Sequence, residues 1–440
     1  MEQNLPIRDI YAREILDSRG IPTLETEVLA GEDIVGTAAV PAEAYAGQYE
    51  ATELRDGDER YDGKGVEQAV ENVNSLIAPA LIGMNVFDQE GIDRALIKAD
   101  GTRDKSGLGA NAILGVSMAA VHTAAAALKM PLYRYLGGVR AAKIPVPVMN
   151  VMGGGTHGSP GMDIREYMIM PAGGHTFREM LRMCAEVYHQ LGNLLRERGM
   201  SAAVGDEGGF AQNTGNVREV LRMIRDGVER AGLSLGRDIQ IALDLAASQL
   251  YDSGRGLYVF PCESRQTGRE ITRSTEEMTD WLEGLASEFP ICAVIDPLDQ
   301  DDWTGWQKMT ERLGKRIQLA GDSLFATNTE RLKLGIDSGA ANGILIKVGQ
   351  AGTLTEAFGA IRMAQNAGYQ VIISQGAGET EDTTIADMAV AFNAEMIRTG
   401  APCRSERVAK YNRLLRIEES LEREKMSAMV KENITVHPHG

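Results

Sequence analysis

Polar residues that could do chemistry close a series of short apolar segments in the later part of the chain. Asp244 ends IQIALD, Asp296 follows CAVI, Asp322 follows IQLAG, Lys347 follows GILI, and Gln375 follows YQVIIS. A run of about four to six aliphatic residues closed by a polar group is typical of a buried parallel strand whose carboxyl end opens into a site. Several carboxylates and one lysine at such an edge indicate metal-assisted removal of a proton.

The elements that must position these residues alternate in type. Amphipathic stretches such as WTGWQKMTERLG and LTEAFGAIRMAQNAG separate the apolar segments, so strands and helices follow one another. This alternation predicts a (β/α) barrel, an α/β fold whose catalytic groups lie at the C-terminal ends of several strands.

The first part of the chain has a different pattern. The segment YAREILDSRGIPTLETEVLAGEDIVGTAAV alternates like antiparallel strands, with turn signals at SRG and GED. The alanine-rich segment SGLGANAILGVSMAAVHTAAAALKM is expected to form a helix packed between other elements. We therefore expect an N-terminal α+β domain over residues 1–140, a barrel over 141–427 and a C-terminal tail over 428–440.

Composition excludes several classes of protein. The chain has 440 residues, 43% of them hydrophobic, which is enough for a full core. It contains no apolar run long enough to span a membrane, and MEQNLPIRDI lacks a signal-peptide pattern, so we expect a cytoplasmic protein without a membrane partner. The net charge of −17 argues against a nucleic-acid partner, whereas a small anionic substrate remains compatible if a local cation reverses the field.

Six longer segments carry a resemblance to a known family. They are EILDSRGIPTLETEV, EATELRDGD, GANAILGVS, AAVGDEGGFAQN, AGETEDTTIADMAVAF and RSERVAKYNRLLRIEE. Together they resemble the enolases, the 2-phosphoglycerate dehydratases of glycolysis, over nearly the whole chain. The resemblance implies an N-terminal α+β domain capping an enolase-type (β/α)8 barrel, a Mg²⁺-dependent site between them, and a homodimer or an assembly of dimers.

The resemblance also implies roles for individual residues. Lys347 matches the base that removes the proton alpha to the substrate carboxylate, and Glu207 matches the acid that helps the β-hydroxyl group leave. Glu166 matches the partner of that acid, and His157 matches a loop histidine that closes on the substrate. A lysine can act as a base near neutral pH only where burial or nearby cations lower its pKa.

The metal ligands match only in part. Asp244 and Asp322 correspond to two of the three carboxylates that hold the catalytic Mg²⁺ in the family, but the third position holds Ile295. The loop whose serine binds a second Mg²⁺ in the family reads AEAYA here, over residues 42–46. We therefore expect one Mg²⁺ site, an all-oxygen site suited to a hard cation, and regard a second site as doubtful.

The substrate contacts also depart from the family pattern. Gln375, Gly376 and Ala377 replace the histidine, arginine and serine of the phosphate-binding segment. Arg398 replaces the lysine that grips the substrate carboxylate, and Arg165 replaces a glutamine. Arginine binds carboxylate or phosphate oxygens bidentately, so the site still suits an anion, with room opened at its phosphate end.

Three hypotheses follow. The first is a diverged lyase that abstracts the alpha proton of a carboxylate and eliminates a β-group, acting on a phospho- or phosphono-carboxylate related to 2-phosphoglycerate. The second is a weak but genuine phosphopyruvate hydratase, in which water, Asp296 or Arg165 replaces the missing ligands. The third is a non-catalytic homologue that serves as a binding protein.

Overall fold

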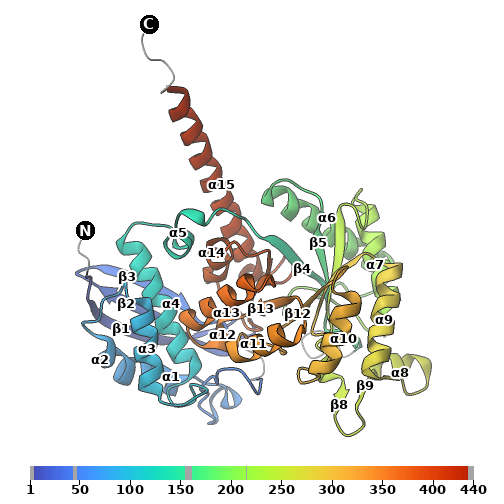
Figure 1. Cartoon of the computed structure of the whole chain (residues 1–440), viewed down its shortest axis with the longest axis horizontal. Coiled ribbons are helices and arrows are strands. Elements are labelled where there is room, and N and C mark those ends of the chain that lie inside the picture. Colours follow the sequence, from blue (N-terminus) through green and yellow to red (C-terminus); the bar gives the residue numbers. More distant parts are fainter. Residues whose placement is uncertain (1–3, 43–46, 154–160, 215, 435–440) are drawn as a thin grey trace.

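The computed structural model describes residues 4–42, 47–153, 161–214 and 216–434, with side chains to residue 424. An antiparallel sheet with helices on one face forms the N-terminal part, and a closed barrel surrounded by helices forms the rest (Figure 1). This arrangement confirms the predicted fold class. The boundaries at residues 140 and 427 stay predictions, and the last helix, α15 (Ser405–Ile434), runs into the segment expected to be a tail.

The N-terminal sheet has the order β1-β2-β3, with β1 (Ile7–Leu16), β2 (Pro22–Ala30) and β3 (Ile34–Ala39) joined by tight turns. The apolar helix α4 (Ala110–Ala127) packs on β2 and β3. A Cβ atom at Gly36 would lie 2.2 Å from the backbone nitrogen of Thr123, so only glycine permits this close approach. By length and composition α4 could cross a membrane, but 83% of it is buried inside the protein, as a core helix is.

The barrel is closed by eight strands. Their order is β15-β14-β13-β12-β11-β7-β5-β4, and β15 pairs with β4 to complete the ring. The bounds are β4 (Val146–Gly153), β5 (Glu166–Pro171), β7 (Ile239–Asp244), β11 (Ile291–Ile295), β12 (Gln318–Gly321), β13 (Gly343–Ile346), β14 (Gln370–Ser374) and β15 (Met396–Arg398).

One strand of the barrel runs against the others. Strand β5 pairs antiparallel with both β4 and β7, whereas the other pairings in the ring are parallel. Its first residue, Glu166, is therefore level with Asp244, the last residue of β7. The reversed strand brings its amino end to the edge where the other strands end.

Apolar side chains from every barrel strand fill the lumen. They form a set of buried residues separate from the main core, and it includes Val148, Met168, Ala242, Ile295 and Leu345. The barrel is therefore a packed core and not a pore, as expected for this architecture. Ile295, at the carboxyl end of β11, belongs to this apolar layer.

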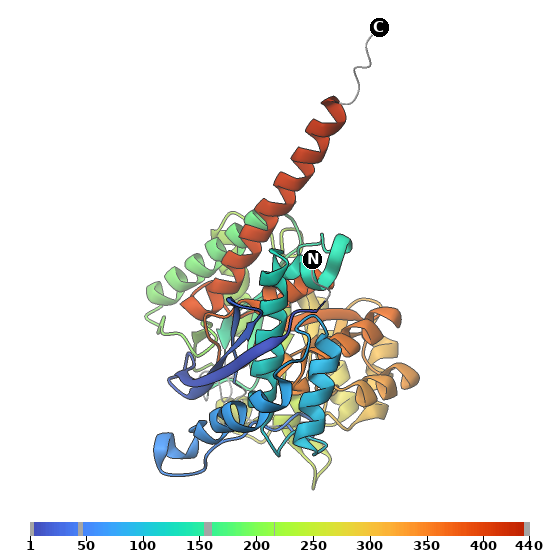
Figure 2. The ribbon, with the colours of Figure 1, turned by 90° about the vertical axis from the view of Figure 1, so that its left-hand side faces the viewer.

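Helices cover the outside of the barrel, and polar caps fix where several begin. Thr176, Ser274 and Thr353 accept hydrogen bonds from backbone N–H groups in the first turns of α6, α9 and α13. Helix α15 starts against the barrel and extends away from the body (Figures 1 and 2). The barrel helices are α6 (Phe177–Glu197), α7 (Val217–Arg230), α9 (Thr275–Glu288), α10 (Trp303–Leu313), α11 (Thr329–Ser338), α12 (Val348–Ala351), α13 (Leu354–Asn366) and α14 (Thr384–Ala391).

The other helices and strands lie outside the sheet of the N-terminal part and outside the ring of barrel strands. In the N-terminal part they are α1 (Glu67–Asn72), α2 (Ala78–Leu81), α3 (Gln89–Asp100) and α5 (Leu132–Gly137). In the barrel part they are β6 (Phe210–Ala211), β8 (Tyr251–Asp252), β9 (Leu257–Val259), β10 (Thr272–Arg273) and α8 (Pro261–Thr267).

Candidate active site

Most of the residues predicted for the site lie at the carboxyl-end mouth of the barrel. Asp244 and Arg398 end their strands, whereas Asp322, Lys347 and Gln375 directly follow theirs. Glu166 reaches the mouth through the reversed strand β5, with Arg165 immediately before it, and Glu207 lies in the loop that leads to β6. Gly376 and Ala377 follow Gln375 in the loop after β14. His157 and residues 43–46 lie outside the described residues.

The Arg165 guanidinium joins the two aspartates expected to bind metal. Its Nε lies 3.1 Å from Asp244 Oδ2, its Nη2 also donates to that oxygen, and Nη2 is 3.5 Å from Asp322 Oδ2. Burial alone would lower the pKa of Arg165, but the charges of Asp244, Glu166 and Asp322 raise it well above its usual value. Arg165 therefore carries a permanent positive charge between these two carboxylates.

A second guanidinium, Arg398, contacts the opposite part of the cluster. Its Nη2 donates to Glu166 Oε1, lies 3.2 Å from Asp244 Oδ2, and lies 3.7 Å from Glu207 Oε2. The Arg398 side chain is only 2% exposed, and the surrounding carboxylates outweigh the effect of burial and raise its pKa. Arg398 thus stays charged although its side chain is almost fully buried.

Lys347 lies on the other side of the cluster. Its Nζ donates to Asp322 Oδ2 at 2.8 Å, and Gln350 Nε2 donates to the second oxygen, Oδ1, at 2.9 Å. Burial alone would raise the pKa of Asp322, but the Lys347 ammonium and the Arg165 guanidinium hold it below its usual range. Asp322 is consequently an anion that orients the lysine amine.

Glu166 and Glu207 are the buried carboxyl groups opposite Asp322. Burial raises the pKa of Glu166 to about 8, against the opposing charge of Arg398. The Gln375 side chain donates from Nε2 to Glu207 Oε2. Three buried polar atoms here lack a hydrogen-bond partner among the described residues: Glu166 Oε2, Gln375 Oε1 and Arg398 Nε. Unpaired buried polar groups are costly, so these atoms indicate where a polar ligand would bind.

The donor set does not fit a magnesium ion. Mg²⁺ needs near-octahedral oxygen ligands at about 2.0–2.1 Å, yet both oxygens of Asp322 and both of Asp244 already accept hydrogen bonds, the last from the Ala246 amide at 3.1 Å. The third position, Ile295, packs in the apolar lumen. In the described part of the chain, no group of three or more His, Cys, Asp or Glu side chains could hold a metal ion.

Asp296, one of the possible replacements for the missing ligand, is held by backbone hydrogen bonds. Its two oxygens accept hydrogen bonds from the backbone N–H groups of Asp322 and Ser323, at 2.9 and 2.8 Å. Burial, followed by the charges of Asp322 and Asp244, raises the pKa of Asp296 to about 7. The side chain braces the end of β12 and thereby fixes the position of Asp322.

The sequence reasoning missed a connection to the N-terminal domain. Gln350 Nε2 also donates to Glu50 Oε1 at 3.0 Å, and Thr327 donates to Gln350 Oε1 at 2.8 Å. Glu50 begins the motif EATELRDGD, which was noted for the resemblance and not for the site. The side chain of Gln350 therefore joins the N-terminal domain to Asp322.

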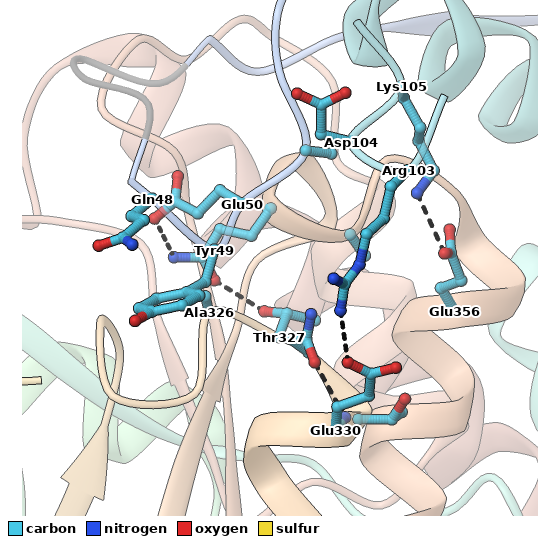
Figure 3. Close-up of a pocket in the computed structure, with 15 residues that line it drawn as sticks. Gln48, Tyr49, Glu50, Arg103, Asp104, Lys105, Ala326, Thr327, Glu330 and Glu356 are labelled. Atoms are coloured by element: carbon cyan, nitrogen blue, oxygen red, sulfur yellow. Dashed lines mark hydrogen bonds and ion pairs between the residues drawn. The ribbon is translucent and has the colours of Figure 1, made fainter. Parts of the chain in front are cut away.

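A cavity of about 710 Å³ lies against this connection (Figure 3). Glu50, Thr327 and Gln350 line one part of it, and Arg103 and Lys105 line another. Lys105 pairs with Glu356 at 3.0 Å, and Arg103 pairs with Glu330 at 2.8 Å. The cavity is lined by both domains beside the cluster.

The loop of Gln375, Gly376 and Ala377, which corresponds to the phosphate-binding segment of the family, is hydrogen-bonded to Arg407. Arg407 is fully buried and donates to the carbonyl oxygens of Gly376, Ala377 and Asp206 at 3.2, 2.9 and 3.1 Å. Its guanidinium therefore joins the loop that carries Gln375 to the loop that carries Glu207.

Two family models match the chain. The N-terminal domain of enolase matches residues 7–136, and the C-terminal TIM barrel domain of enolase matches residues 141–434. The chain belongs to the enolase family. Membership of this family suggests a hydro-lyase, and the family typically uses Mg²⁺.

Proposed function

We propose that the chain is a carbon–oxygen lyase that removes the proton alpha to a carboxylate and expels a group from the β-carbon. In this proposal Lys347 is the base, and Glu207, assisted by Glu166, is the acid. The substrate is a phospho- or phosphono-carboxylate related to 2-phosphoglycerate. The observation that carries the proposal is the arrangement of one amine and two buried carboxyl groups around the paired guanidinium groups of Arg165 and Arg398.

The proton transfer follows from the contacts of Lys347. An amine accepts a proton only in its neutral form. Neutral Lys347 still has N–H groups that can donate to Asp322 Oδ2, and this contact holds the amine at the barrel mouth, where a bound substrate would meet its lone pair. Loss of the alpha proton places negative charge on the substrate carboxylate, and fixed cations in a dry site stabilise such charge strongly.

The leaving group would meet the opposite side of the cluster. Burial raises the pKa of Glu166 to about 8 and keeps its carboxyl group protonated at neutral pH, which suits its proposed role of assisting Glu207, the acid that donates to the leaving oxygen. The unpaired Glu166 Oε2 and Arg398 Nε suit a ligand with both a hydroxyl group and a carboxylate. Gln375, Gly376 and Ala377 leave the phosphate end less charged than in the family pattern, which favours a larger or differently charged group there.

The magnesium ion predicted from the resemblance stays a prediction, which the donor set does not favour, and no step of the proposed reaction requires it. A homodimer or dimer-based assembly and a cytoplasmic location are likewise proposals supported by family membership alone. Sedimentation of the purified chain would test the assembly.

Exchange of the alpha proton is the direct test of the proposed function. Incubation in D₂O with 2-phosphoglycerate and with bulkier phosphono-carboxylates, followed by proton NMR, detects the first step even where elimination is slow. We expect exchange with at least one phosphono-carboxylate and its loss in Lys347→Met. Rapid formation of phosphoenolpyruvate from 2-phosphoglycerate would instead favour the weak hydratase, and no exchange with any carboxylate would favour the non-catalytic homologue.

A further inference from the structure

The position of Arg165 is the starting point for an inference about the metal. Its guanidinium contacts Asp244 Oδ2 through two nitrogens and lies 3.5 Å from Asp322 Oδ2. These are the two carboxylates that the family resemblance assigns to the metal ion. A cation supplied by the chain itself thus lies where a divalent cation would have to bind.

The neighbouring residues leave little for a metal to bind. Asp322 also holds Lys347 at 2.8 Å, and Asp244 also lies 3.2 Å from Arg398. Ile295 places an apolar side chain, 1% exposed, at the position of the third carboxylate. The guanidinium groups of Arg165 and Arg398 and the amine of Lys347 therefore already contact the oxygens of Asp244 and Asp322, and a divalent cation would have to displace them.

We propose that Arg165 is the built-in cation of this site and that the chain works without a divalent metal. As a catalytic residue, which rests on the proposed function, Arg165 stabilises the negative charge that develops on the substrate carboxylate. Guanidinium suits this task because it is permanently charged and presents paired N–H donors to carboxylate oxygens. The absence of a metal requirement follows from the donor set alone and can be tested without a substrate.

The alternative is that a metal ion displaces Arg165 when it binds. Each charge-assisted hydrogen bond that must break lowers the affinity by about 10- to 100-fold. Metal binding at Asp244 and Asp322 would break at least the Arg165 and Lys347 contacts. The expected affinity is therefore lower by about 10²- to 10⁴-fold than in a site with free carboxylates.

The test is a Mn²⁺ titration of the full-length chain, with free Mn²⁺ followed by electron paramagnetic resonance and Mg²⁺ used as a competitor. The variants are Arg165→Gln, which restores the glutamine of the family pattern, and Arg165→Gln combined with Ile295→Glu, which also restores the third carboxylate. We expect the double variant to bind Mn²⁺ at least about 100-fold more tightly than the unmodified chain. Arg165→Gln alone should show a smaller gain, and it keeps the test decisive if the double variant does not fold.

Arg13 supplies a matched control. Like Arg165, it bridges two carboxylates, Glu25 and Glu27, but it does so on the surface of the N-terminal sheet. Arg13→Gln frees a carboxylate pair without altering the barrel mouth, so it should leave Mn²⁺ binding and turnover unchanged. A gain equal to that of Arg165→Gln would mean that any freed pair attracts the ion, and it would overturn the inference.

Two further results separate this inference from the proposed function. Turnover that persists in excess EDTA supports the inference, and turnover that requires Mg²⁺ overturns it while leaving the lyase proposal intact. If no substrate reacts under either condition, the lyase proposal fails, and the Mn²⁺ titration still decides the question of the metal. Tight Mn²⁺ binding by the unmodified chain, equal to that of the double variant, overturns the inference directly.

Discussion

Replacement of Lys347 by methionine tests the centre of the proposed chemistry. Methionine keeps much of the length and apolar character of the lysine stem but removes the amine that donates to Asp322 Oδ2 at 2.8 Å. Of the residues proposed to transfer protons, only Glu207 and Glu166 then remain, and both are assigned to the acid. In the proposed function the substrate is bound by Arg165 and Arg398, so substrate binding should survive the change.

The structure sets the size of both expected effects. Loss of a positioned general base lowers kcat by about 10²- to 10⁴-fold, while KM changes little because the amine acts in the transition state. Breaking a buried ion pair commonly costs about 3–5 kcal/mol. Asp322 keeps Arg165 at 3.5 Å and Gln350 at 2.9 Å. The free energy of unfolding should therefore fall by less, about 1–3 kcal/mol.

Lys105→Met is the matched control. Lys105 is also buried and also forms an ion pair, with Glu356 at 3.0 Å, but it lies outside the cluster of catalytic residues. The assay is alpha-proton exchange in D₂O together with a thermal melt of each variant. We expect comparable shifts in melting temperature and a loss of exchange in Lys347→Met alone. An exchange rate in Lys347→Met above about one-tenth of the original would refute its role as base.

Other substitutions probe the surroundings of the site. Asp296→Asn should alter the pH dependence of stability. Neutral Asp296 stabilises the fold at low pH, and this contribution is lost as the pH rises from the usual pKa of 3.8 through the raised pKa of about 7. The melting temperature of the original chain should therefore fall relative to that of the variant over this pH range. Arg407→Met removes the donor to the carbonyl groups of Gly376, Ala377 and Asp206 and should lower the free energy of unfolding, measured by calorimetry, by about 3 kcal/mol or more. The control is Arg423→Met, which removes an exposed ion pair and should change the free energy of unfolding by less than about 0.5 kcal/mol. Gln350→Leu removes the donor to Asp322 and Glu50 and should reduce kcat; unchanged kcat in steady-state assays would show that this contact has no catalytic effect.

The sequence predicted the barrel because its strands carry a local signal. Apolar runs closed by Asp244, Asp322 and Lys347 end where the structure places their strands, and Arg398 ends the last one. The pattern depends only on burial and strand length, which neighbouring residues determine. The direction of β5 carries no such signal, since a strand buried on both faces reads alike in either direction.

The pairing of charges could not be read from the sequence. The substrate contact predicted for Arg165 stays a prediction, but its bridge between Asp244 and Asp322 was not predicted. Which carboxylate a buried cation selects depends on distances between strands that are far apart in the chain. The contact between Gln350 and Glu50 spans 300 positions and has no local pattern at all.

The hydrogen bond from Gln350 to Glu50 has a consequence for how this protein could be re-engineered. The carboxylate of Glu50 comes from the cap, and the amide that it holds also fixes Asp322 in the barrel. A chimera that joins the N-terminal domain of another protein to this barrel would keep the barrel strands. It would lose the hydrogen bond from Gln350 to Glu50 and keep only the one from Gln350 to Asp322. Recombination between homologues should therefore succeed only where Glu50 and Gln350 are inherited from the same parent.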